Sequence, residues 1–85
     1  MEPITLSCSG LETKQQLHAA LAEALRFPNW YGHNLDALYD CLRDLDGAVH
    51  LYLLDWETLP DWKAAFRAVL EDAENDSPAF TVSFA

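Results

Sequence analysis

The chain has 85 residues, and its 14 acidic against only five basic residues give a formal net charge of −9 at pH 7. Nucleic acids and anionic membranes bind Lys and Arg, so this balance argues against both as direct partners and favours a basic protein. The length predicts a single domain over residues 1–85, and a hydrophobic fraction of 51% is enough for a packed core.

The first ten residues, MEPITLSCSG, have no basic start and no apolar stretch of the kind that a secretory signal needs. No apolar run reaches the length of a membrane span. Cys8 and Cys41 have no metal-ligand spacing, and one possible pair does not make a disulfide framework. We therefore expect a cytoplasmic protein with reduced thiols, monomeric when free and without a cofactor.

The first third of the chain predicts a strand, a helix and a loop. Residues 4–6 form a short β-prone run. Thr13, followed three residues later by Gln16, matches a capping box and predicts a helix over residues 14–26. The helix should end before Pro28, because the residue preceding a proline avoids helical geometry. Residues 28–34 are then a loop, in which Gly32 permits a positive φ.

Asn34 is a good N-cap for a second helix, over residues 35–45, which Asp46 and Gly47 should end. The apolar side chains of this helix share one arc, as a buried face requires. They are Leu35, Leu38, Tyr39, Leu42 and Leu45. The acidic side chains occupy a mostly opposite arc. They are Asp36, Asp40 and Asp44.

The second half predicts a strand, a helix and a strand. Residues 49–54 are nearly continuously apolar, as in a strand covered on both faces. A third helix should span residues 61–74, and residues 80–84 should form the last strand. Helices between strands favour parallel pairing with right-handed crossovers. We therefore predict an α/β fold, a small three-stranded parallel sheet packed with about three helices.

The acidic row on the second helix is the most informative feature. Like charges four residues apart cost about 0.2–0.5 kcal/mol per pair, and the row contains two such pairs. Asp44 also lies near the helix C-terminus, where the macrodipole disfavours an anion. Trp30 and Tyr31 precede the row, and aromatic side chains of these types are enriched at interface hot spots. Tyr39 is equally compatible with the core and with an interface.

Catalysis has weaker support. His18 and His50 lie in a predicted helix and strand and are expected to be structural. His33 lies near Asp36 and Asp40, so a metal-assisted hydrolase is one alternative. There is no G-x-S-x-G frame and no glycine-rich phosphate loop. We expect a binding protein rather than an enzyme, with an adaptor for some other basic protein as a further alternative.

The run WYGHNLDALYDCL, residues 30–42, closely resembles the central signature of the barstar family, whose members inhibit barnase-type ribonucleases inside the cell. The pair Asp55–Trp56 resembles the family as well. The resemblance implies a parallel three-stranded sheet with packed helices. It also implies that the loop and second helix plug the active site of a secreted, guanyl-preferring ribonuclease. The connection after Trp56 is short, so the family's third helix should be reduced to a turn.

The resemblance also assigns roles to residues. Asp40 would be the central contact and mimic a substrate phosphate, and Asp36 would pair with a basic residue at the rim. Trp30 would stack near the catalytic histidine, and Tyr39 would replace a tryptophan. An acidic residue of the last helix would contribute, Asp72 or the adjacent Glu71. The expected partner-binding set is Trp30, Tyr31, Gly32, His33, Asn34, Asp36, Tyr39, Asp40, Asp44 and Asp72.

Overall fold

The computed structural model describes residues 1–85 as an α/β fold built on three parallel strands. They are β1 (Glu2–Ser7), β2 (Val49–Leu54) and β3 (Phe80–Phe84). The strand order is β1-β2-β3, so β2 is central and pairs in parallel with both neighbours. The predicted fold class is confirmed, as are the bounds of β2 and β3.

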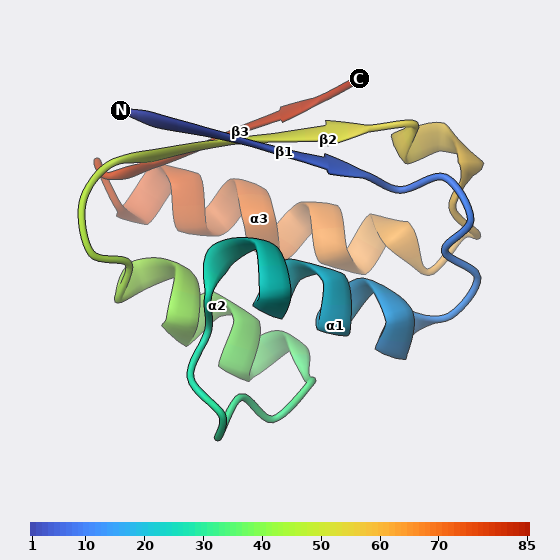
Figure 1. The fold of residues 1–85 in the computed structure, drawn as a ribbon, viewed down its shortest axis with the longest axis horizontal. Helices are drawn as coiled ribbons and strands as arrows, with labels where there is room; N and C mark the ends of the chain where they lie inside the picture. The colour runs from blue at the N-terminus through green and yellow to red at the C-terminus, as the bar shows by residue number, and fades with distance from the viewer.

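All three helices lie on one side of this sheet, as Figure 1 shows. They are α1 (Lys14–Leu25), α2 (Leu35–Arg43) and α3 (Lys63–Asp76). The first and third along the chain pack against the strands, whereas the second packs mainly against the third. After β2 there is only a short 3-10 turn, η1 (Trp56–Thr58), so the expectation of a turn after Trp56 is confirmed. None of the helices combines the length and the apolar character needed to cross a membrane.

The opposite face of the sheet has no helix over it, so the expectation that β2 is covered on both faces is wrong. Val49, Leu51 and Leu53 point toward the helices and are buried, whereas His50 and Tyr52 are half-buried on the open face. Their rings stack at a centroid distance of 4.0 Å. The stacked His50 ring covers part of the Tyr52 side chain. Tyr52 can therefore lie on a sheet face that no helix covers.

Local sequence signals explain where most elements begin. Thr13 Oγ1 accepts a hydrogen bond from the Gln16 backbone N–H at 3.1 Å, and Gln16 Oε1 accepts one from the Thr13 N–H at 3.1 Å. This is the predicted capping box. α1 ends one residue earlier than expected, at a left-handed Arg26 with φ 58°. β1 is longer than expected and includes Pro3, which an edge strand tolerates.

The ends of α2 and α3 differ from the prediction. α2 ends at Arg43 rather than residue 45, because the Asp44 N–H is shared between the carbonyls of Asp40 and Cys41, which tightens the last turn. α3 begins and ends two residues later than expected. At its end the Ser77 N–H donates to the Ala73 carbonyl. The helix therefore includes Asn75 and Asp76, which were expected to form a turn.

A core of 18 buried hydrophobic residues lies between the sheet and the helices. Its largest fully buried side chains are Trp56, Phe66 and Phe80. The helical period of the third predicted helix also places Ala65 on its buried side, but Ala65 is exposed. Burial of this kind contributes about 25 cal/mol per Å² of apolar surface and fixes α2 and its preceding loop on a rigid base.

Candidate functional site

A tight turn places Trp30 on the surface. The Tyr31 backbone N–H donates to the Pro28 carbonyl at 3.0 Å, which closes a turn with Trp30 near its tip. The Trp30 side chain is 69% exposed, whereas Tyr31 next to it is only 7% exposed. One short segment therefore presents an indole to solvent and anchors itself with the neighbouring ring.

Tyr31 belongs to the core, and its low exposure leaves little of its side chain for a partner, so its expected partner-binding role stays a prediction. Its hydroxyl lies 2.6 Å from Nδ1 of the buried His18 on α1. Burial raises the pKa of Tyr31, so the phenol keeps its proton and donates. Burial, followed by the charge of His33, lowers the pKa of His18, so a neutral imidazole accepts. The pair holds the loop against α1.

Gly32 and His33 shape the loop in a way the sequence did not indicate. The positive φ is at His33, at 50°, and not at Gly32 as expected. Gly32 is needed for a different reason, since a Cβ there would lie 2.9 Å from Asn34 Nδ2. His33 Nδ1 lies 3.1 Å from Gln15 Oε1 on α1. This contact adds a second link between the loop and α1.

Asn34 joins the loop to α2. Its Oδ1 accepts a hydrogen bond from the Ala37 N–H at 2.8 Å, and its Nδ2 donates to the Gly32 carbonyl at 3.3 Å. The predicted N-cap is confirmed. The amide thus fixes both the start of the helix and the backbone that carries Trp30, so the position of the indole relative to α2 is set before any partner arrives.

The acidic row lies on the surface of α2. Asp36 and Asp40 are exposed, and Asp44 is the exposed C-cap of the helix. The two salt bridges of the protein join Lys63 with Glu57 and Arg67 with Glu71, so none of the three aspartates is in an ion pair. Their carboxylates keep their hydrogen-bonding capacity for a partner.

Trp30 and the later part of the acidic row meet at one surface hollow. The hollow has a volume of about 410 Å³ and is lined by Trp30, Asp40, Arg43 and Asp44. Asp36 lies one helical turn before Asp40 and outside the hollow. The structure therefore brings together an exposed indole, two carboxylates and one guanidinium, and the carboxylates are suited to binding a cationic group.

Tyr39 is half-buried at the contact between α2 and α3. Its hydroxyl donates a hydrogen bond to the carboxylate of Asp76 on α3. That hydrogen bond is the main reason why the pKa of Tyr39 is raised, with desolvation and the Asp76 charge adding to it and Arg43 opposing it. Tyr39 thus connects the acidic face of α2 to an acidic residue of α3.

One acidic residue of α3, Asp76, contacts α2 through Tyr39. Asp72 is one turn before Asp76 and so shares its helix face, and it is exposed. Glu71 instead approaches Arg67 at 3.5 Å. Asp76 was missed from the sequence because the helix was expected to end at residue 74. The four-residue spacing between Asp72 and Asp76 was the available signal.

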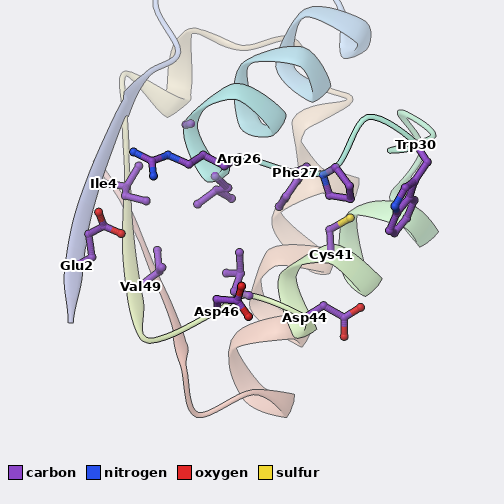
Figure 2. A pocket seen from close by; sticks show the side chains of 13 residues that line it. Glu2, Ile4, Arg26, Phe27, Trp30, Cys41, Asp44, Asp46 and Val49 are labelled. Carbon is purple, nitrogen blue, oxygen red and sulfur yellow. The ribbon is translucent and has the colours of Figure 1, made fainter.

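A larger cavity, of about 510 Å³, lies between the edge of β1, the end of α1 and the end of α2. Figure 2 shows Glu2 on one side of it and Trp30 on the other, with Asp46 between them. Trp30 and Asp44 line both this cavity and the hollow. The indole therefore stands between two recesses, where a partner can reach it.

No group of three His, Cys, Asp or Glu side chains is arranged to hold a metal ion. The hydrolase alternative, which needed His33, Asp36 and Asp40 together, has no geometric support. Cys8 and Cys41 are free and buried. Burial, followed by the charge of Asp55, raises the pKa of Cys8 to about 11, and burial also raises that of Cys41. Both thiols are therefore held in the unreactive protonated form.

Comparison with known proteins gives a family match over almost the whole chain. The family model described as "Barstar (barnase inhibitor)" matches residues 1–84. A Bacillus subtilis (strain 168) protein named "Putative ribonuclease inhibitor YrdF" is 45% identical over 42 residues. That match covers 49% of this chain and 46% of the relative, so it spans about half the length of each.

Proposed function

The chain belongs to the barstar family, and from this premise we propose that it inhibits a secreted, guanyl-preferring ribonuclease by filling its active site. The inhibitor acts inside the cell that makes the nuclease, where it protects cellular RNA. Asp40 is the central contact, Asp36 pairs with a basic residue at the rim, and Trp30 stacks beside the catalytic centre.

The observation that supports this proposal best is the unpaired, exposed carboxylate of Asp40 beside the exposed indole of Trp30. A nuclease that binds RNA offers Arg and Lys to phosphate groups. A carboxylate accepts the same charge-assisted hydrogen bonds, often in a bidentate arrangement with Arg. Asp40 can therefore occupy the position of a substrate phosphate.

Rigidity adds to affinity. Asp40 is on a capped helix, and Trp30 is on a loop that hydrogen bonds tie to α1 and α2. A surface that is already ordered loses less conformational entropy when it binds. Because the loop and the helix are fixed together, the indole and the carboxylate can enter one cleft without rearrangement.

The uneven distribution of acidic residues should speed association with a basic ribonuclease. Eleven of the 14 acidic residues lie between Asp36 and Asp76, so the second half of the chain carries most of the negative field. Such a field steers a basic protein toward the acidic face and raises the association rate at low salt. Asp72 extends this face onto α3, because Glu71 is engaged with Arg67.

Inhibition of barnase tests the proposal. The purified chain is titrated into barnase while cleavage of a fluorogenic RNA substrate is followed, and binding is measured in parallel by calorimetry. We expect cleavage to stop at one inhibitor per enzyme, with EDTA making no difference. No inhibition at a large molar excess would contradict the proposal. Binding without inhibition would favour the adaptor alternative instead.

A further inference from the structure

Arg43 is the only basic residue of α2, and it lies in the last turn, next to the acidic row. It follows Tyr39 by four residues, Asp40 by three and Asp36 by seven, spacings that place all of them on neighbouring parts of one helical surface. Arg43 is exposed and lines the hollow with Trp30 and Asp40. A cation at this position has to be explained, because the proposed partner is itself cationic.

Arg43 is not used to neutralise the aspartates around it. Neither salt bridge of the protein includes it, although Asp40 is close enough along the helix to form one. Its guanidinium lies over the ring of Tyr39 instead, 5.7 Å from the centroid, within the range of a cation–π contact. The hydrogen bond from Tyr39 to Asp76 fixes that ring. Arg43 is thus held beside Asp40 while both charges stay free.

The hollow therefore presents both signs of charge to a partner. Asp40 and Asp44 suit a cation, whereas Arg43 suits an anion a few ångströms away along the helix. A ribonuclease that works by general acid–base catalysis needs a proton acceptor in its cleft, and a carboxylate can fill that role. A guanidinium binds such a group in a planar, bidentate way that an ammonium cannot reproduce.

We propose that Arg43 determines specificity by pairing with a carboxylate in the ribonuclease cleft, next to the cation that Asp40 binds. The inference rests on the proposed function and adds a requirement on the partner. A ribonuclease with cations at both positions is repelled by Arg43, and one with a carboxylate there is selected. Without such pairing, Arg43 would only weaken the attraction between the acidic face and a basic enzyme.

Removal of the Arg43 guanidinium distinguishes these two roles. Affinity for the ribonuclease should fall if Arg43 pairs with a carboxylate and rise if Arg43 only weakens the attraction. We would measure the association and dissociation rates of barnase with Arg43→Met and with the matched control Arg67→Met. Both substitutions change the net charge from −9 to −10. Arg67 is on α3 over the ring of Phe84, which keeps it away from the hollow. The proposal predicts at least about a tenfold loss of affinity for Arg43→Met, mainly through faster dissociation, and a change within about twofold for Arg67→Met.

Two further variants sharpen the test. Arg43→Lys keeps the positive charge but cannot form the planar, bidentate pair of hydrogen bonds. Its affinity for barnase should therefore lie between those of the wild type and Arg43→Met. Changing each carboxylate of the barnase cleft to its amide in turn should identify one whose change abolishes the effect of Arg43→Met. Thermal unfolding of each free variant shows whether it is folded.

The inference would be overturned if Arg43→Met bound barnase as tightly as the wild type, or more tightly. Asp40→Ala separates this outcome from failure of the proposed function. If Asp40→Ala abolishes inhibition while Arg43→Met does not weaken it, only the specificity role is wrong. If neither variant weakens binding, or if the unmodified chain does not inhibit barnase, both proposals are wrong.

Discussion

Tyr39 on α2 donates a hydrogen bond to the carboxylate of Asp76 on α3, and this contact ties the acidic face of one helix to the neighbouring helix. The ring of Tyr39 also supports the guanidinium of Arg43. A residue that pattern analysis left open between core and interface therefore has a defined structural task. It sets where two charged groups of the candidate site lie.

The titration of Tyr39 should report this contact. The hydrogen bond to Asp76 raises the pKa of Tyr39 above its usual value of 10, since the neutral phenol is the form that donates. The unfolded chain then loses this proton at a lower pH than the folded one, so the stabilisation is present below pH 10 and is lost as the pH rises above it. In Asp76→Asn, absorbance titration should show Tyr39 ionising at a lower pH. An unchanged titration curve would show that the bond is not formed in solution.

Gly32 and Asn34 should show strong non-additivity. Asn34→Ala removes the N-cap of α2 and should cost about 1 kcal/mol of the free energy of unfolding. Gly32→Ala places a Cβ 2.9 Å from Asn34 Nδ2 and should cost about 1–2 kcal/mol by overpacking. In the double variant the clashing amide is absent, so the loss should be smaller than the sum. Urea unfolding of the three variants gives this coupling, and strict additivity would exclude a direct contact.

The stability of the protein should depend on the protonation of His18. Burial lowers its pKa below the ordinary value of 6.5, so the unfolded chain takes up this proton at a higher pH than the folded one. The free energy of unfolding should therefore be constant above about pH 6.5 and fall below it, by at most about 1.4 kcal/mol per pH unit from this group. Urea unfolding between pH 5 and 8 measures the effect. His18→Gln should remove this dependence, and an equally steep loss in that variant would assign it to another group.

Local signals predicted much of the fold. The capping box of Thr13 and Gln16 and the N-cap of Asn34 depend on side chains a few residues apart, and both form as expected. The alternation of helices and strands predicted a parallel sheet, which the structure has. These features depend on short-range chemistry and on the handedness of crossovers, so a sequence is enough to predict them.

Features that depend on contacts between distant residues were harder to predict. Tyr31 was expected at the interface, yet it is buried, and its hydroxyl donates a hydrogen bond to His18, thirteen residues earlier. β2 reads as covered on both faces, yet its open side is completed by the stacking of His50 on Tyr52 and by a 2.8 Å contact between His50 and Ser83 of β3. Spacing within one segment contains no information about such partners.

The candidate site divides in the same way. The exposure of Asp36 and Asp40 follows from the helical period, which sets them opposite the buried Leu38 and Leu42. The contact between Asp76 and Tyr39 was not predictable, because it depends on how α3 packs against α2. Sequence therefore identified the acidic row, and the structure added the residues that frame it.

Inhibition of barnase by the Asp40→Ala variant tests most directly whether Asp40 takes the place of a substrate phosphate. Glu57→Ala, in η1 and outside the hollow, makes the same change in net charge and is the matched control. We expect Asp40→Ala to weaken inhibition by at least about a hundredfold and Glu57→Ala by no more than about twofold. The free Asp40→Ala protein should be as stable as the wild type or slightly more stable, because repulsion with Asp36 and Asp44 is relieved. If Asp40→Ala inhibits as well as the Glu57→Ala control, Asp40 does not take the place of a substrate phosphate.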